Sequence, residues 1–573
     1  MFANTVTPTE PATAGETPAP QRRGALRKLR PVWADIALLV VLAGAVIRLR
    51  RWHTGVPLWL DEQMVSLNIR DRDFPDLIGV LRFNQSAPLG WLWTEWMAVR
   101  VGGVDERVLR FVPLMFGIGT IVVAWWIGRR WLGPVGAVVL TSLCAFTPQF
   151  LRYADEVKQY TSDTFWVLLL VALAGWVLDQ PDRPRRMFVW WGVAAFALWF
   201  SMAAVLVAPG IVLVLVGVRW RRRGWRAALV AALPGFGWLA SFGLHYYLAL
   251  RYAVGSDFLT TYWKIGFPPK PFSVGTTLSW LADRPALLAA DPIGTPRAGL
   301  FWSLVVLGLA VALWRRPSHG LLLLAPVASA FVLAAAHVVP LIARLALWFV
   351  PVLFVIVAVA INAPARALVG ALRRARAGQG TAGRWVTVAV LGCAVLMFAG
   401  AAVVLVEPIA TAARAPRLPT NGVDDRAAVH WVAKERRDGD LVLVTRHSWA
   451  AFLWYDRWYD AADGPGTLRL TANVEPGKDC ADDELGDGLR DKRRVIFYSG
   501  IRLTPYPRTN EVVAARLAEQ GTLVETKRWG MVEVRVFEIG DARPPGTPAP
   551  VLAAVKANCV QVIDPDRAQP AQR

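Results

Sequence analysis

RRGALRKLR at residues 22–30, followed directly by PVWADIALLVVLAGAVIR at residues 31–48, is the stretch that decides the fold. The first block is strongly basic, and the second is an apolar run that approaches the roughly 20 residues a helix needs to cross a bilayer. Basic residues beside a span stay on the cytoplasmic side. The two blocks therefore predict a first membrane helix that starts in the cytoplasm and sends the following segment to the opposite side.

The composition of the whole chain is that of a membrane protein with many spans. Of its 573 residues, 55% are hydrophobic and 28 are tryptophan, which is unusual for a soluble enzyme. A net charge of +20 could suggest nucleic acid as a partner. However, the Arg clusters fall between apolar runs, and no basic patch is interleaved with stacking aromatic residues. The sequence thus argues against nucleic-acid binding.

About eleven transmembrane helices are predicted between residues 31 and 406. After 31–48, spans are expected near 110–128, 133–150, 164–179, 187–203, 204–218, 227–249, 299–314, 319–338, 342–362 and 385–406. This arrangement keeps the Arg-rich connections in the cytoplasm. It requires the apolar stretch 87–103 to lie in the interface or to re-enter, because a full crossing there would put Arg129 and Arg130 outside.

Three segments of different composition divide the chain. Residues 1–30 predict a disordered cytoplasmic tail, residues 31–406 a transmembrane module, and residues 407–573 a small α/β domain on the extracytoplasmic side. In the last segment we expect helices over Asp425–Arg437, Ser448–Tyr455 and Glu511–Gln520, strands over Leu441–Thr445 and Arg494–Tyr498, and paired strands ending at Phe537.

The four cysteines do not form a metal-binding pattern. Cys144 and Cys393 lie in apolar runs, whereas Cys480 and Cys559 belong to the domain expected outside. A disulfide between the latter two would suit an oxidising exterior, but the sequence gives no distance and leaves their pairing open. Because neither a CxxC pair nor an HExxH helix occurs, no structural zinc site is predicted.

The predicted topology brings four polar segments to one side of the membrane: residues 50–109, 151–163, 250–298 and 338–344. Four short motifs stand in three of them, PLWLDE at 57–62, SAPLG at 86–90, RYADEVKQY at 152–160 and PLIAR at 340–344. A carboxylate pair such as Asp61-Glu62 can remove a proton from a hydroxyl at such a surface, whereas it would be costly inside the hydrocarbon.

In this order the motifs resemble those of GT-C fold glycosyltransferases, specifically the superfamily of protein O-mannosyltransferases and lipid A aminoarabinose transferases. The resemblance covers residues 31–362. It implies a GT-C fold and transfer of a sugar from a polyprenyl-phosphate donor to an acceptor hydroxyl, usually with inversion. Ser86-Ala87 replaces the more usual His-Pro or Lys-Pro, Lys158 stands where Arg is commoner, and residues 407–573 do not resemble the sugar-binding domains of eukaryotic members.

Roles for individual residues follow from the reaction that the resemblance implies. We expect Asp61 to act as the general base and Glu62 to support or orient it. Arg344 and Lys158 are expected to stabilise the negative charge that develops on the leaving lipid phosphate.

The remaining site residues have more than one interpretation. Asp155, Glu156 and Asp163 could hold sugar hydroxyls, orient Lys158 or bind a divalent cation, and the sequence does not choose among these. Tyr160 and Trp59 offer flat faces for a sugar ring. The aromatic residues beside the long loop 250–298 suggest that this loop covers the site.

Each charged residue also has a purely structural interpretation. Asp61 could cap a helix, Arg344 could anchor a span at the interface, and Lys158 could form a surface ion pair with Glu156 or Asp155. A flippase-type protein would be expected to carry ionisable residues at mid-membrane depth, but spans such as 168–175 and 304–312 are uncharged there. A non-catalytic protein of envelope glycan assembly stays open as an alternative. The favoured hypothesis is a glycosyltransferase of a bacterial plasma membrane acting on an envelope glycan, lipid or protein.

Overall fold

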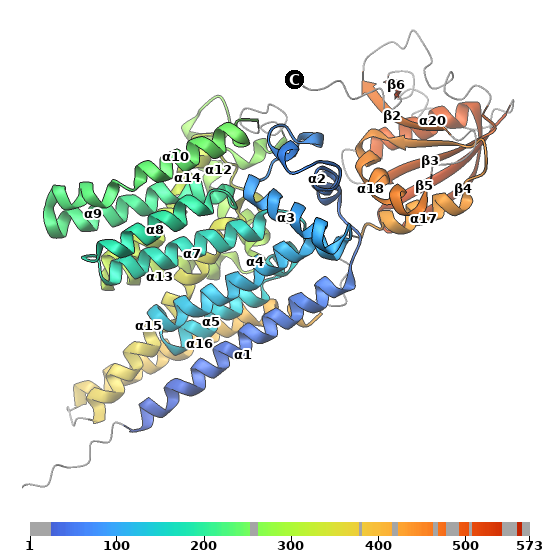
Figure 1. Ribbon diagram of the computed structural model, residues 1–573. Helices are drawn as coiled ribbons and strands as arrows, with labels where there is room; N and C mark the ends of the chain where they lie inside the picture. Colours follow the sequence, from blue (N-terminus) through green and yellow to red (C-terminus); the bar gives the residue numbers. More distant parts are fainter. Residues whose placement is uncertain are drawn as a thin grey trace, which may run out of the picture.

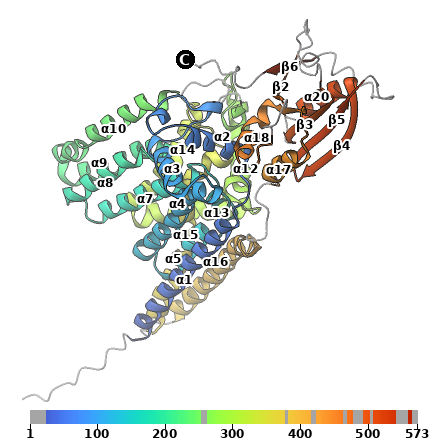
Figure 2. The ribbon, with the colours of Figure 1, turned by 45° about the vertical axis from the view of Figure 1, so that its right-hand side comes forward.

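A helical bundle and a separate β-sheet region make up the protein (Figures 1 and 2). The computed structural model describes residues 24–252, 262–376, 381–414, 422–461, 468–476, 492–502, 507–540 and 558–563. In both views the sheet region lies beside one end of the bundle, next to the short helix α2 (Leu60–Asp71).

Apolar helices of 13 to 34 residues form the bundle. They are α1 (Gly24–Thr54), α4 (Glu106–Ile127), α5 (Pro134–Phe146), α7 (Tyr160–Asp179), α8 (Pro184–Ala197), α9 (Met202–Ala232), α10 (Gly235–Leu248), α13 (Ala298–Arg315), α14 (Pro317–Ala335), α15 (Val350–Arg376) and α16 (Thr381–Arg414). By length and composition, six helical stretches among the described residues could cross a membrane: Glu106–Leu132, Tyr160–Asp179, Met202–Leu248, Ala298–Arg315, Pro317–Ala335 and Ala343–Pro364. The count of eleven spans therefore stays a prediction.

Short helical elements connect these helices. They are α3 (Leu89–Gly102), α6 (Pro148–Tyr153), α12 (Val274–Leu288), η1 (Pro75–Leu77), η2 (Arg82–Asn84), η3 (Gly128–Leu132), η4 (Leu250–Tyr252), η5 (Lys264–Gly266), η6 (Ala289–Ile293) and η7 (Ala343–Phe349). With 14 residues, α3 is shorter than the roughly 20 needed to span a bilayer. Its predicted interfacial or re-entrant position stays a prediction.

Basic turns mark where several helices begin or break. Pro134, Pro184 and Pro317 each begin a helix directly after such a turn, where the missing N–H of proline costs no hydrogen bond. Gly224, at φ +78°, interrupts α9 within its Arg-rich stretch. Residues other than glycine rarely adopt this backbone conformation. Gly224 therefore permits the break between the spans predicted at 204–218 and 227–249.

The centre of the bundle is formed by α7 and by the stretch of η7 and α15. In the apolar windows of Ala343–Pro364 and Tyr160–Asp179, 89% and 78% of residues are buried, against 28% for Ala298–Arg315. Two predicted site residues, Arg344 and Tyr160, stand at the starts of these two central stretches. The packing of the core therefore fixes the positions of both.

The N-terminal boundary differs from the sequence expectation. Helix α1 begins at Gly24, so residues 24–30, which we expected in the disordered tail, are helical. Ala, Leu, Arg and Lys all favour helix, and the helix continues through the basic block. Residues 1–23 lie outside the described residues.

The C-terminal region contains one six-stranded mixed sheet in the order β4-β5-β3-β1-β2-β6. Its strands are β1 (Leu441–Thr445), β2 (Leu468–Pro476), β3 (Arg494–Ile501), β4 (Gly521–Trp529), β5 (Val532–Ile539) and β6 (Asn558–Ile563). The central strand β1 is parallel to β2 and β3, and the outer pairs are antiparallel. Helices α17 (Asp425–Glu435) and α18 (Trp449–Tyr459) pack on one face, and α20 (Pro507–Gln520) packs on the other.

Most elements expected in this region occur close to their predicted positions. The strand over Leu441–Thr445 has the predicted bounds, and the helices expected from Asp425, Ser448 and Glu511 correspond to α17, α18 and α20. Strands β2 and β6 were not expected. Cys480 lies outside the described residues, so its pairing with Cys559 stays open. That this region is a separate extracytoplasmic domain also stays a prediction.

The sheet region and the bundle share one hydrophobic core. A single cluster of buried side chains joins Val442, Ile496 and Phe452 of the sheet region to Leu58 and Leu109 beside the bundle. Because burial of apolar surface is the main stabilising term, this continuous cluster holds the sheet region against the bundle, with α18 packed on α2.

Candidate active site

Asp61 lies in the first turn of α2 and forms an ion pair with Arg344, which is 283 residues away in the sequence. The side chains of Asp61 and Arg344 are 23% and 18% exposed, so a molecule at the end of the bundle can reach both. Burial acts to raise the pKa of Asp61, but the nearby charges of Lys158 and Arg344 lower it overall. Asp61 is therefore an accessible carboxylate between two cations.

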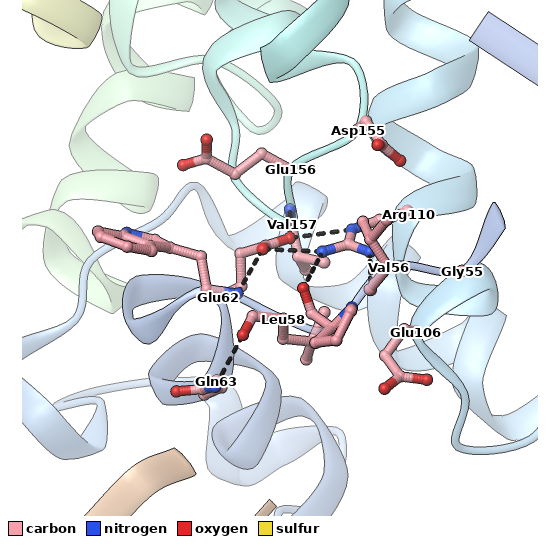
Figure 3. A network of polar contacts seen from close by, with 12 residues as sticks. Gly55, Val56, Leu58, Glu62, Gln63, Glu106, Arg110, Asp155, Glu156 and Val157 are labelled. Atoms are coloured by element: carbon pink, nitrogen blue, oxygen red, sulfur yellow. Dashed lines mark hydrogen bonds and ion pairs between the residues drawn. The ribbon is translucent and has the colours of Figure 1, made fainter. Parts of the chain in front are cut away.

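Glu62 is oriented differently from its neighbour and is completely buried. Its carboxylate accepts hydrogen bonds from the backbone N–H of Trp59 at 2.7 Å and of Val157 at 2.7 Å. It also accepts two from the Arg110 guanidinium, at 3.1 Å from Nε and 2.9 Å from the terminal nitrogen, as Figure 3 shows. The capping role that the sequence allowed for Asp61 thus belongs to Glu62, which leaves Asp61 free of that function.

Lys158 belongs to the turn between α6 and α7. Its Nζ donates to Oε1 of Gln85 at 2.5 Å, and Asp61 is the neighbouring charge that does most to favour its charged form. Burial and the proximity of Arg344 nevertheless lower the pKa of Lys158. The surface ion pair with Glu156 or Asp155 that the sequence left open is not among the contacts of this side chain in the described residues.

Glu156 is buried, and neither of its carboxylate oxygens has a hydrogen-bond partner among the described residues. Its nearest ion-pair contact is with Nε of Arg152 at 3.8 Å. Burial and the negative charge of Glu62 raise the pKa of Glu156 to about 7. Figure 3 shows Glu156 and Asp155 on the same turn beside the Glu62–Arg110 pair, pointing in different directions.

Two aromatic rings flank the Arg344 guanidinium. Its Cζ lies 5.8 Å from the ring centroid of Tyr160 and 5.5 Å from that of Trp263. These distances are in the range of cation–π attraction. Trp263 belongs to the loop 250–298 that we expected to cover the site, although residues 253–261 of that loop lie outside the described residues.

Not all predicted residues share this cluster. Oδ1 of Asp163 accepts hydrogen bonds from Ser201 Oγ at 2.6 Å and from the Ala203 N–H at 3.1 Å, so this carboxylate holds the start of α9. Asp155 forms an ion pair of 3.5 Å with Arg51 of α1. Trp59 is half-buried and immediately precedes α2.

Three residues near the site were missed from the sequence. Arg110 was treated only as the start of a span, and Gln85 precedes a recognised motif without belonging to it. Burial and the negative charge of Asp291 raise the pKa of Tyr153. Burial also raises the pKa of Asp291, while the positive charges of Arg152 and Arg344 act against this shift. Asp291 therefore lies close to these residues of the site. A polar residue at the start of a span was the available signal for Arg110, whereas Asp291 gave no comparable signal.

Potential metal ligands do not gather at this site. Within the part of the chain that the structure describes, no group of three His, Cys, Asp or Glu side chains is placed to hold a metal ion. Two of the candidates, Asp163 and Asp155, are instead bound by Ser201 and Arg51.

Asp61 is a partly exposed carboxylate near two cations at the end of an apolar helical bundle, an arrangement that can accept a proton and attract an anionic group. Comparison with protein families gives the class more closely. Residues 86–243 match the family model described as dolichyl-phosphate-mannose-protein mannosyltransferase. This match, over residues 86–243, confirms the resemblance to the protein O-mannosyltransferase superfamily inferred from the motifs, and it indicates glycosyltransferase activity.

Solved structures that are similar to this chain include proteins from two organisms. ArnT from Cupriavidus metallidurans in the apo state matches with a TM-score of 0.49 and 15% identity, covering 90% of this chain and 98% of ArnT. The same protein bound to undecaprenyl phosphate gives 0.49 and 14%, with the same coverage. The Archaeoglobus fulgidus oligosaccharyltransferase in complex with Zn and sulfate gives 0.45 and 12%, covering 87% of this chain and 72% of that chain. With TM-scores below 0.5, these likenesses add nothing to the family match. No curated protein matches the chain.

Proposed function

We propose that the protein transfers a sugar from a polyprenyl-phosphate donor to a hydroxyl group of an envelope acceptor, with inversion and with Asp61 as the general base. The reaction would take place on the extracytoplasmic side of a bacterial plasma membrane. The family match over residues 86–243 supports the enzyme class, and the surroundings of Asp61 support the mechanism.

The contact between Asp61 and Arg344 is the observation that carries this proposal. Positive neighbours lower the pKa of Asp61, so it is ionised at neutral pH and can accept the proton of an acceptor hydroxyl. When a donor phosphate approaches, Arg344 and Lys158 can exchange part of their interaction with Asp61 for interaction with the phosphate oxygens. The negative charge on that phosphate grows in the transition state, so these cations stabilise it more than the ground state.

The other predicted residues divide between sugar binding and support. Glu156 has unused acceptor oxygens and Tyr160 presents a ring beside Arg344, so we assign both to the sugar. Trp59 stays a candidate for ring stacking. We assign Glu62 to positioning, because all its interactions are with the protein itself.

Two predicted substrate contacts are less well supported. The carboxylates of Asp155 and Asp163 interact with Arg51 and with the start of α9, so we assign them structural roles. No contact of the described residues favours a divalent cation as part of the mechanism.

The experiment that tests the proposal is a donor panel. Purified protein is incubated with a set of polyprenyl-phosphate sugars, including mannose, arabinose and aminoarabinose derivatives, together with a crude envelope fraction as acceptor. We expect one donor to release free polyprenyl phosphate in a protein-dependent manner. Release from no donor, with a folded protein confirmed in the same preparation, would contradict the proposal.

A further inference from the structure

The segment that carries Asp61 is held from two sides. Residues 55–59 form no regular element, so their backbone polar groups need partners from elsewhere. On the bundle side, Arg110 donates to the carbonyl oxygens of Val56 and Pro57, the latter at 3.1 Å. On the other side, the partners come from the C-terminal region.

Tyr455 of α18 provides the first of these contacts. Its hydroxyl oxygen accepts a hydrogen bond from the Leu58 N–H at 2.8 Å, although the two residues are 397 positions apart. Leu58 and Tyr455 are 0% and 1% exposed. Water therefore cannot replace this acceptor if the hydroxyl is removed.

Asp425, at the start of α17, provides the second contact. Its carboxylate accepts from Nε2 of Gln63 at 2.8 Å and from the hydroxyl of Tyr498. The same Gln63 Nε2 donates to the carbonyl oxygen of Leu58 at 2.7 Å. Gln63 and Asp425 are buried, so this chain connects the sheet to the first turn of α2 through contacts shielded from water.

Arg426 provides the third contact, one residue further along α17. Its guanidinium donates to the Gly55 carbonyl oxygen at 2.7 Å and to Oε1 of Glu106 at 2.7 Å. The C-terminal region therefore binds the segment at Gly55, at Leu58 and at Gln63. Asp61 lies between the last two of these points.

We infer that Tyr455 and Asp425 are positioning residues for the general base, so that the C-terminal region sets the geometry of the reaction without touching the substrate. This inference rests on the function proposed above. A base must lie within hydrogen-bond reach of the proton it removes, and a displacement of about 1 Å can lower the rate about 100-fold. Docking of α17 and α18 fixes the loop that determines where Asp61 lies.

The test uses the full-length protein and two variants that each remove one contact. Tyr455→Phe deletes the acceptor of the Leu58 N–H. Asp425→Asn leaves one acceptor oxygen for two donors, Gln63 and Tyr498. Tyr459→Phe is the matched control, because Tyr459 lies one turn further along α18, its ring packs on His430, and it is the hydroxyl of Tyr455 that binds residues 55–63.

Two measurements separate this inference from the proposed function. Hydrogen–deuterium exchange reports on peptides covering residues 55–63 whether or not the protein is active. We expect faster exchange there in Tyr455→Phe and Asp425→Asn, and exchange as in the unchanged protein in Tyr459→Phe. With the active donor, we expect kcat to fall about 10-fold or more in the two variants while the donor KM stays within about twofold.

Unchanged exchange at residues 55–63 in both variants would overturn the inference, as would faster exchange with an unchanged kcat. If the unchanged protein releases no lipid phosphate from any donor, only the proposed function fails, and the exchange result still decides whether the C-terminal region holds this segment.

Discussion

Two adjacent carboxylates, Asp61 and Glu62, have different properties because their surroundings differ. Glu62 is fully buried and bound by four donors, whereas Asp61 is partly exposed and pairs with Arg344, which is also partly exposed. A carboxylate with all its acceptor positions filled cannot accept a proton from a substrate without losing a contact. The chemical role in the proposed mechanism therefore falls to Asp61.

Glu156 gives a prediction about pH. Burial and the charge of Glu62 raise its pKa to about 7, so it is largely neutral below pH 7 and becomes negative above it. A negative Glu156 beside Arg344 would repel an incoming donor phosphate. We expect kcat/KM for the donor to fall as the pH rises through about 7, and Glu156→Gln to flatten this decline while keeping activity at pH 6.

The control for this prediction is Asp73→Asn, which changes an exposed carboxylate just after α2 and should leave the pH profile unchanged. A decline that persists in Glu156→Gln would show that another group titrates.

The residues of this site could be predicted from the sequence only in part. Asp61, Lys158, Tyr160 and Arg344 were recognised because each belongs to a local motif. Residues that bind these motifs, such as Arg110, which pairs with Glu62, and Gln85, which accepts a hydrogen bond from Lys158, stand outside the motifs. A motif contains only residues that are adjacent in the sequence. The burial and charge of a site also depend on side chains from distant segments.

At the scale of elements, the first turn of α2 depends on the buried ion pair between Glu62 and Arg110. Both side chains are 1% exposed. Removing one member of such a pair leaves the other charge buried and uncompensated, which typically destabilises a protein by about 3–5 kcal/mol. We expect Glu62→Gln to lower the apparent Tm in detergent markedly.

Glu519→Gln is the comparison for this change. Glu519 pairs with Arg516 on α20, where the side chains are 34% and 30% exposed, and such pairs contribute about 0–1 kcal/mol. A similar shift of Tm in both variants, or none in Glu62→Gln, would show that the buried pair does not hold α2.

Single helices and strands were easier to predict than the pairing between strands. The apolar runs identified the helices, and the short continuous run LVLVT at Leu441–Thr445 identified β1, because each pattern is local. The alternation of Leu468, Leu470, Ala472 and Val474 was a usable signal for β2 that we did not recognise. The short β6 is defined by its pairing with β2, and a six-residue strand offers little pattern of its own.

At the scale of the whole molecule, the predicted topology places Asp61 and the C-terminal region on the same side of the membrane. Their direct contacts through Leu58 and Gln63 agree with a shared side. Which side this is can be tested with single cysteines at the exposed positions Asp73 and Arg221, in a background where the four native cysteines are replaced.

We expect a membrane-impermeant maleimide to label Asp73→Cys in intact cells and to label Arg221→Cys only after permeabilisation. The reverse pattern would place the candidate site in the cytoplasm. Labelling of both positions in intact cells would contradict the proposed path of the chain through the membrane.

The union of the sheet region with the bundle could not be predicted from the sequence. Tyr455 and Leu58 are 397 positions apart, and neither position carries a signal of the other. Composition identified the C-terminal region as soluble in character, but its α18 packs against α2, and buried side chains of this region belong to one cluster with those of α2, α3 and α4.

The most direct test of the account is the turnover of Asp61→Asn measured beside its binding of the donor. Asp71→Asn, at the other end of α2 and also paired with arginine, is the matched control. Because general base catalysis contributes about 10²–10⁴-fold, we expect the turnover of Asp61→Asn to fall by that factor. This variant should still bind the donor at least as well as the unchanged protein. Asp71→Asn should stay active. Turnover of Asp61→Asn within about twofold of the unchanged protein would contradict the assignment of Asp61 as the base.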